Sequence, residues 1–176
     1  LKIPYTHSGV ISSFNAMNKL ISKEMFIKNN IKTPKFVPIK KTEYKTKTIQ
    51  KIINSKKINF PVVLKPINEG SSFGVRIIEK LSNSKLKIIN NELKKYKTLL
   101  QENFIEGQEI QTAVLGGKVI GSVEIIPKRN FYDYKAKYSK LAKTKHIIPP
   151  RISKKISEKI KKISIKAHNC LNCRGV

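Results

Sequence analysis

The chain has 176 residues, which is enough for one large domain with a sizeable core, and its 37 basic and 11 acidic residues give a net charge of +26. Such a charge suggests a nucleic-acid binder, but only Arg76, Arg129, Arg151 and Arg174 are arginine, and aromatic stacking platforms are not interleaved with the lysines. Specific nucleic-acid sites favour arginine forks and stacked aromatic rings, so we expect no specific nucleic-acid partner.

The sequence also predicts a cytoplasmic protein with no membrane segment. It has no run of about 18 apolar residues, and its first residues lack the basic-then-apolar order of a signal peptide. The chain starts at Leu1 without a methionine and ends in Cys173, Arg174, Gly175 and Val176, a pattern typical of a helix giving way to a strand. We therefore expect a fragment of a longer protein.

Residues 10–30 predict an interrupted helix, because apolar side chains recur there at near-helical spacing and Asn18 is a plausible cap between two segments. Lys19 follows this cap, where the helix dipole does not favour a cation. Lys19 either binds a ligand or is a solvated surface lysine. The second alternative is favoured by the sequence alone, because the chain is rich in lysine. Residues 36–39 follow Pro34 and include Pro38, which predicts an edge strand.

Residues 42–57 predict an amphipathic surface helix, and residues 62–64 a strand buried on both faces. Lys65 ends that apolar run, where a charge needs a partner, so we expect it to point into a site. The loop 69–74 offers two glycines, free amides and the hydroxyls of Ser71 and Ser72, which suit a phosphate. A plain hairpin loop is an equal alternative, since the Walker spacing is absent and residues 75–78 resume a strand pattern.

Residues 82–96 predict a helix with one apolar face, and residues 101–109 then gather three of the scarce acids. Residues 110–114 and 119–126 alternate around Gly116 and Gly117, which predicts a β-hairpin. We expect residues 61–115 to contain an antiparallel sheet with the 82–96 helix on one face.

Residues 129–145 predict a long aromatic segment that is either a lid or a packed surface loop. Residues 147–150 predict a strand that stops, and Ser153 caps a predicted helix with an apolar stripe at positions 156, 160, 163 and 167. His168, Cys170 and Cys173 do not complete a four-ligand zinc set, so we expect no metal site here and two reduced, mostly buried thiols.

Four parts of the chain together resemble the D-alanine–D-alanine ligase family, whose fold is the ATP-grasp. They are residues 1–10, residues 64–66 with 69–72, residues 101–102 with Glu109, and residues 131–138. The resemblance implies an α+β ATP-grasp fragment with a central antiparallel-sheet subdomain and helices packed on it. It places the end of the N-terminal substrate domain at residues 1–17 and the ATP-grasp region at 18–176. Within that region, residues 58–115 are the expected central ATP-binding subdomain and 116–176 the start of a truncated C-terminal subdomain.

The resemblance also implies roles for single residues. ATP phosphates are assigned to Lys19, Lys65 and Lys137 and to the loop serines Ser71 and Ser72, and adenine and ribose to Glu102, Ile105 and Glu109. The catalytic contacts are assigned to Ser71, to Lys137 near the transferred phosphate, and to Tyr138, which hydrogen-bonds toward the loop serine from the lid. Lys135 departs from the family, which often has an acid there.

The implied reaction joins two D-alanines with ATP, through an acyl-phosphate, to make a peptidoglycan precursor. The family's Mg²⁺ ligands are expected beyond Val176, so the chain alone is expected to be inactive, and the resemblance allows a homodimer of the full-length protein. Three alternatives stay open: another ATP-grasp carboxylate–amine ligase, a non-catalytic nucleotide-binding fragment, and a basic nucleic-acid-binding domain.

Overall fold

The computed structural model describes residues 3–43, 58–128, 139 and 143–175. Among these residues no helix is both long enough and apolar enough to cross a bilayer. The chain divides into two compact units, one made of Leu1–Lys32 and Gly107–Val176 and the other of Thr33–Glu106. The second unit starts and ends earlier than the expected ATP-binding subdomain, residues 58–115, whose limits in an intact enzyme stay a prediction.

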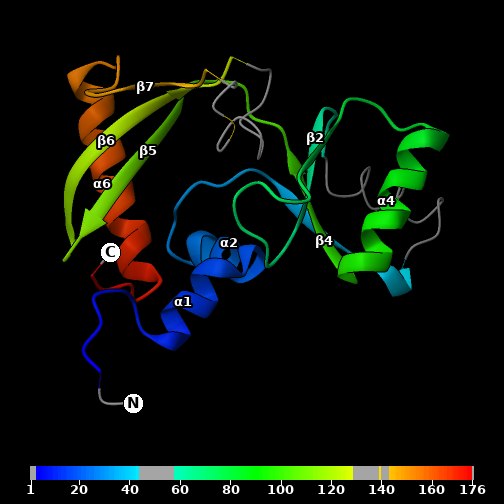
Figure 1. Ribbon diagram of the computed structural model, residues 1–176, viewed down its shortest axis with the longest axis horizontal. Helices are drawn as coiled ribbons and strands as arrows, with labels where there is room; N and C mark the ends of the chain where they lie inside the picture. The colour runs from blue at the N-terminus through cyan, green and yellow to red at the C-terminus, as the bar shows by residue number, and fades with distance from the viewer. Residues whose placement is uncertain (1–2, 44–57, 129–138, 140–142, 176) are drawn as a thin grey trace. The chain divides into compact units, whose positions relative to one another are not determined.

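The unit Thr33–Glu106 is built on a four-stranded sheet in which every neighbouring pair is antiparallel (Figure 1). Its strands, in sheet order, are β1 (Phe36–Lys40), β4 (Thr98–Asn103), β2 (Val62–Pro66) and β3 (Arg76–Ile78), and η1 (Lys41–Glu43) follows β1. β1 is an edge strand, as predicted, and this position tolerates Pro38 because one side of an edge strand donates no ladder hydrogen bond.

Strand β4 is the element that the sequence pattern failed to predict. It lies between β1 and β2, and the four residues from Leu99 to Glu102 are all buried. Its second half, Gln101 to Asn103, is polar, so neither an apolar run nor a regular alternation marks it as an interior strand.

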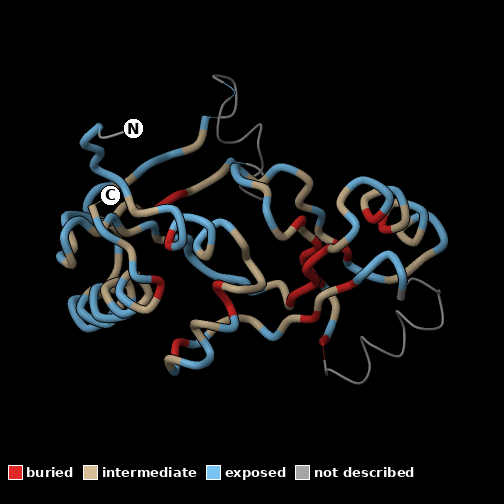
Figure 2. The backbone as a smooth tube through the Cα atoms, turned by 90° about the horizontal axis from the view of Figure 1, so that it is seen from below, coloured by how far each residue is buried: buried red, intermediate tan, exposed pale blue. Residues whose placement is uncertain are grey.

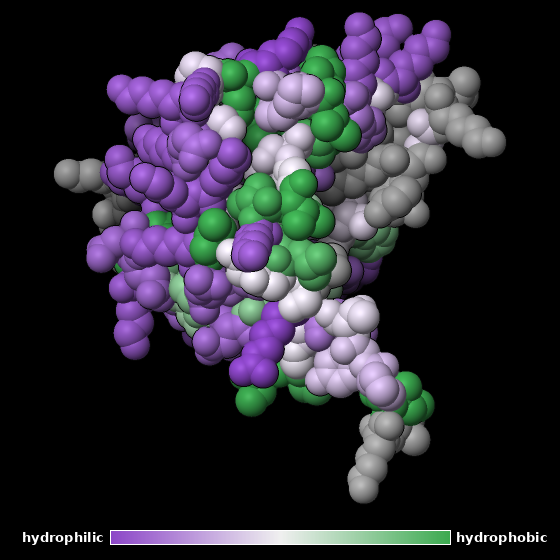
Figure 3. Space-filling model, turned by 90° about the vertical axis from the view of Figure 1, so that its left-hand side faces the viewer, coloured by the Kyte–Doolittle hydropathy of each residue, from purple (hydrophilic) through white to green (hydrophobic). Residues whose placement is uncertain are grey.

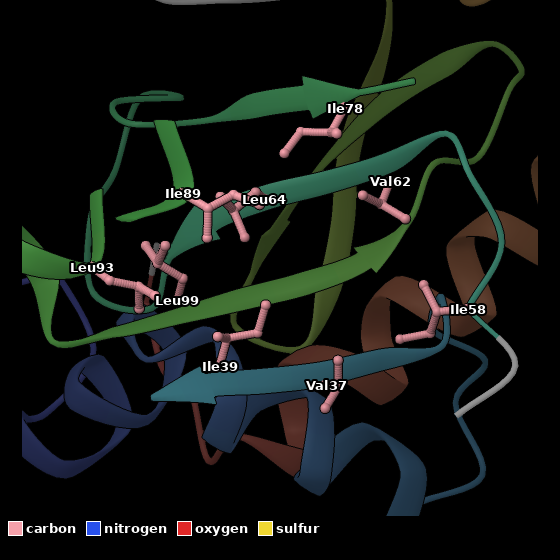
Figure 4. Close-up of a cluster of buried hydrophobic side chains, with 9 residues drawn as sticks. All are labelled: Val37, Ile39, Ile58, Val62, Leu64, Ile78, Ile89, Leu93 and Leu99. Atoms are coloured by element: carbon pink, nitrogen blue, oxygen red, sulfur yellow. The ribbon is translucent and has the colours of Figure 1, made fainter. Parts of the chain in front are cut away.

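Helix α4 (Asn83–Tyr96) covers one face of this sheet, as predicted. Ser82 begins it, and the Ser82 hydroxyl accepts a hydrogen bond from the backbone N–H of Lys85 at 3.4 Å. Ile89 and Leu93 extend from the helix into the core, where they meet side chains from all four strands (Figure 4). The full cluster is Val37, Ile39, Ile58, Val62, Leu64, Ile78, Ile89, Leu93 and Leu99. In Figure 2 the buried stretches of this unit follow its strands.

The described residues of the other unit form three helices and three strands, which come from the first and last parts of the chain. Helices α1 (Val10–Met17) and α2 (Lys19–Lys28) are separated at Asn18, whose side-chain oxygen accepts hydrogen bonds from the N–H groups of Leu20 and Ile21, both at 3.1 Å. The predicted interruption is therefore confirmed. The remaining elements are β5 (Glu109–Leu115), β6 (Lys118–Ile126), β7 (Lys145–Ile147) and α6 (Lys154–Cys170).

Strands β5 and β6 form the predicted hairpin and make, with β7, an antiparallel sheet in the order β5-β6-β7. Gly116 and Gly117 both have positive φ, 55° and 75°, as a tight hairpin turn of this kind requires. This sheet is separate from the one in Thr33–Glu106. The expected sheet in residues 61–115 is thus confirmed for β2, β3 and β4, whereas β5 belongs elsewhere.

Helix α6 packs against β5 and β6 (Figure 1), and Ser153 begins it by accepting from the N–H of Ile156 at 3.3 Å. The predicted apolar stripe is covered only in part, because Ile156 and Ile163 are exposed. Cys170 and Cys173 are free thiols of intermediate exposure, so most of each side chain is covered, as predicted, but neither thiol is fully buried. Partial burial still raises the pKa of the Cys170 thiol, which disfavours the reactive thiolate.

The surface of this unit carries both hydrophilic and apolar side chains (Figure 3). Figure 3 shows hydrophilic side chains over much of one face and a band of apolar side chains between them. Exposed apolar residues of the unit include Ile120, Ile148, Ile156 and Ile163.

Candidate functional site

The sheet face turned away from α4 holds a pair of opposite charges in the unit Thr33–Glu106. Val63 pairs with Glu102 across β2 and β4, and Lys65 pairs with Leu100, so these four side chains share one face. Their neighbours Leu64 and Leu99 point the other way, into the core under α4. Lys65 and Glu102 are diagonal neighbours on this face, and the Lys65 ammonium contacts the Glu102 carboxylate.

This ion pair changes the physical argument for Lys65. The sequence predicted an anionic partner because the charge follows a buried strand, and the structure supplies that partner from inside the chain. The two side chains are 21% and 8% exposed, so the lysine keeps some contact with solvent while the carboxylate has almost none. The attraction to Lys65 offsets the energetic cost of burying the Glu102 carboxylate. The remaining hydrogens of the Lys65 ammonium can donate to a second anion at the open side of the pair.

The loop between β2 and β3 places Ser71 and Ser72 in the left-handed backbone region, with φ of 49° and 60°. This conformation costs a residue with a side chain roughly 1–2 kcal/mol, so two in succession mark a constrained turn. The turn is closed by a hydrogen bond from the N–H of Phe73 to the carbonyl of Gly70 at 2.9 Å. It is both a hairpin connection and a turn rich in backbone amides, so the two interpretations of the loop are compatible.

The loop between β2 and β3 is held in place at Gly74 and at Phe73. A Cβ on Gly74 would lie 2.7 Å from the Cγ of Pro66, and Gly74 has φ +69°, so only glycine fits this position. At the tip, the Lys95 ammonium of α4 lies 4.6 Å from the centre of the Phe73 ring and 4.8 Å from that of Tyr96. A hydrogen bond with Tyr96 raises the pKa of Lys95, which keeps this cation charged.

The other predicted site residues lie in several places. Ile105 follows β4 in the same unit and is 66% exposed. Lys19 is the first residue of α2, and Glu109 is the first residue of β5, where its carboxylate accepts from the Gln111 side chain at 3.4 Å. Lys137 and Tyr138, with the rest of the predicted lid at 129–138, lie outside the described residues, as does most of the predicted helix at 42–57.

The structure also shows a polar cluster that the sequence did not predict. Glu124 in β6 is 2% exposed and accepts hydrogen bonds from the Arg151 and Gln108 side chains and from the backbone N–H of Arg151. These donors, with Arg151 first, lower the pKa of Glu124 from an ordinary 4.5 to about 2. A scarce acid at an inward position of an alternating strand was the signal that could have found it.

Within the described residues, no group of three or more histidine, cysteine, aspartate or glutamate side chains could hold a metal ion. The described candidates for ligand binding are therefore those predicted to contact the nucleotide, apart from Lys137.

Comparison with known proteins gives consistent matches. The family described as "D-ala D-ala ligase C-terminus" matches residues 25–176. A D-alanine–D-alanine ligase of Pelagibacter ubique is 50% identical over 176 residues, which are 99% of this chain and 56% of that protein. One of Wolbachia pipientis wMel is 40% identical and is covered over 53% of its length. The chain spans about half the length of the curated relatives it matches.

Solved structures agree with the sequence relatives. The D-alanine–D-alanine ligase of Bacillus anthracis has a TM-score of 0.80 at 28% identity, over 98% of this chain and 54% of that one. The same enzyme complexed with ATP has a TM-score of 0.77 at 26% identity, over 98% of this chain and 53% of that one. The α+β ATP-grasp fold expected from the sequence is thereby confirmed.

Proposed function

The chain belongs to the D-alanine–D-alanine ligase family, and from this premise we propose that it is the ATP-binding part of an enzyme that makes D-alanyl-D-alanine for peptidoglycan precursors. The observation that carries the proposal is the Lys65–Glu102 pair on the sheet face opposite α4. A cation for phosphate and a carboxylate for the adenine amino group lie side by side there, and the loop with Ser71 and Ser72 leaves the same strand.

The residues present suit a nucleotide. The Lys65 side chain is partly exposed, so its ammonium can reach an anion without first breaking the core. The Ser71–Ser72 turn offers hydroxyls and amides to phosphate oxygens, and Ile105 offers an exposed apolar side chain and its backbone to a planar base. We also assign ATP contacts to Lys19 and Glu109. Lys19 would contact the phosphates, and Glu109 would accept hydrogen bonds from the ribose hydroxyls.

The proposed reaction has two displacements. The carboxylate of one D-alanine attacks the γ-phosphorus of ATP, and ADP leaves, which forms an acyl-phosphate. The amine of the second D-alanine then attacks the acyl carbon, loses a proton and displaces phosphate. Lys65 and Lys137 would hold and neutralise phosphate oxygens, while Tyr138 and Ser71 would close the lid over the site and exclude water from the acyl-phosphate.

Magnesium belongs to the same proposal, because phosphoryl transfer from ATP ordinarily uses a divalent cation to neutralise the β- and γ-phosphates. The described residues contain no cluster of ligands that fits it, so we route no step through it here. Its ligands, D-alanine binding, a homodimer and a cytoplasmic location are all proposed for the full-length protein. A nucleotide-binding piece without ligase activity is the second candidate, because the chain covers only about half of its relatives.

An ATP-binding titration of the 176-residue chain tests the first part. Lys65→Ala should weaken binding by roughly 10- to 100-fold, because a hydrogen bond to a charged group is worth about 1.5–3 kcal/mol. Lys161→Ala, which removes an exposed lysine of α6, is the matched control and should change little. Equal effects of the two substitutions would refute the proposed phosphate contact.

A product assay tests whether these residues contain a whole catalytic site. The chain with ATP, Mg²⁺ and D-alanine should release no D-alanyl-D-alanine, whereas a full-length relative should. Dipeptide at even a hundredth of the full-length rate would show that the whole catalytic site, including its metal ligands, lies within these residues.

A further inference from the structure

The carboxylate of Glu124 joins the two outer strands of the β5-β6-β7 sheet to the middle one. Its Oε1 accepts from the Gln108 Nε2 at 3.1 Å and from the Arg151 Nη2 at 2.9 Å. Its Oε2 accepts from the Arg151 Nε at 3.0 Å and from the Arg151 backbone N–H at 3.1 Å. Each oxygen therefore accepts two hydrogen bonds, and the fork of Arg151 binds it in the bidentate geometry that is strongest for such pairs.

The three residues come from different parts of the chain. Gln108 precedes β5, Arg151 follows β7, and Glu124 lies in β6 opposite Ile110 and Ile147. With Glu124 only 2% exposed, its charge is kept inside the unit by these donors. Loss of any one donor would leave part of a buried carboxylate without compensation, so the cluster is a rigid attachment rather than a surface ion pair.

This attachment acts with the β5–β6 ladder to set where Glu109 points. Glu109 lies between Gln108 and Ile110, and both neighbours are held toward the face that carries Glu124. In an extended chain the residue between them must point to the opposite face, where Gln111 donates to the Glu109 carboxylate.

Gly107, the residue before Gln108, lies in open space. Gly107 has φ +151°, and a Cβ there would meet no atom within 4 Å. Glycine pivots easily in such open space, so the Gln108 contact holds the chain just ahead of the β5–β6 ladder, which begins at Glu109 opposite Ile125.

We propose that Gln108 and Glu124 are positioning residues that hold Glu109 in the orientation in which its carboxylate accepts hydrogen bonds from the ribose hydroxyls of ATP. This inference rests on the proposed function, because it takes the ribose contact of Glu109 as given. It adds that a glutamine and a buried glutamate, neither of which touches the nucleotide, determine how strongly the enzyme distinguishes a ribose from a sugar without hydroxyls.

The test compares two nucleotides, ATP and 2′,3′-dideoxy-ATP, in binding titrations with the 176-residue chain. Glu109→Ala should raise the Kd for ATP roughly tenfold and leave the Kd for the dideoxy nucleotide unchanged, because only ATP has the hydroxyls. Gln108→Leu keeps an uncharged side chain that is one atom shorter and removes its donor. It should raise the Kd for ATP about three- to tenfold, again with no change for the dideoxy nucleotide.

Two further variants control for general damage. Thr112→Val breaks the side-chain hydrogen bond with Ser122 in the same hairpin, 2.9 Å long, and should leave the ratio of the two Kd values unchanged. Gln108→Lys restores a donor toward Glu124 and should restore the ratio. A merely structural role for Gln108 would lower the melting temperature without changing the preference for ATP over its dideoxy analogue.

The outcomes separate this inference from the proposed function. Suppose that Glu109→Ala lowers the affinity for ATP alone, but Gln108→Leu lowers the affinity for both nucleotides equally or for neither. The positioning role is then overturned and the ribose contact stands. If Glu109→Ala has no selective effect, or the unaltered chain binds neither nucleotide, the ribose assignment itself is overturned, and the inference is overturned with it.

Discussion

Substitution of Lys65 by methionine isolates the energetic value of the ion pair with Glu102. Methionine keeps most of the apolar stem and removes only the ammonium, which leaves a carboxylate that is 8% exposed. Breaking a fully buried pair costs about 3–5 kcal/mol, and an exposed pair contributes about 0–1 kcal/mol. Because the Lys65 side chain is 21% exposed, we expect Lys65→Met to lower the free energy of unfolding by roughly 1–3 kcal/mol.

The double-mutant cycle with Glu102→Gln separates the pair from its surroundings. Glu102→Gln alone should also destabilise, since it leaves the ammonium facing a neutral amide. The double variant has neither charge. Its loss of unfolding free energy should therefore be smaller than the sum of the losses of the two single variants by about 1–2 kcal/mol.

The assay is urea unfolding at pH 7, followed by circular dichroism. Lys161→Met, which breaks an exposed i,i+3 pair with Glu158, is the control and should change stability by no more than about 0.5 kcal/mol. Additive effects of the two substitutions at Lys65 and Glu102 would refute the coupling. A Lys65→Met variant as stable as Lys161→Met would show that the pair contributes nothing to the fold.

Three other substitutions test separate parts of the structure by the same unfolding assay. Gly74→Ala should destabilise by roughly 1–3 kcal/mol, because its Cβ would overlap Pro66 at a φ of +69°, whereas Gly70→Ala, with no atom near its Cβ, should be nearly neutral; equal losses would contradict the steric argument. Ser82→Ala removes the N-cap of α4 and should cost about 1 kcal/mol, and no loss compared with the exposed Ser84→Ala would show that the cap is unimportant. For Glu124, the folded pKa of about 2 lies below the ordinary 4.5, so its stabilisation is fully present above pH 4.5 and is lost as pH falls toward 2. Glu124→Gln should therefore be less stable than the unaltered chain at pH 6, with a difference that shrinks in that window; a difference constant from pH 6 to pH 2.5 would contradict the assigned ionisation.

Elements with local signals could be predicted from the sequence. Asn18 separates two helices and Ser82 begins α4, because each side chain accepts hydrogen bonds from amides only two or three residues ahead. Gly116 and Gly117 specify the hairpin turn through their own backbone freedom. In each case the deciding interaction lies within about one turn of the chain, so one short stretch contains the whole cause.

The site was predictable only as a list of residues. The motifs at Lys65, Ser71 and Glu102 assigned candidates through family resemblance, and a lysine after a buried strand independently indicated a site. That Glu102 is itself the partner of Lys65 could not be read from the sequence, since the pairing depends on the register between β2 and β4.

Tertiary structure alone decided the features that join distant segments. β4 is an interior strand because β1 and β2 pair on its two sides, although four of its six residues are polar. Glu124 has its low pKa because Arg151, 27 residues away, is brought against it across β6 and β7. Such interactions form only after long loops have closed and a strand register has been chosen, and both depend on the whole core rather than on any local stretch of sequence.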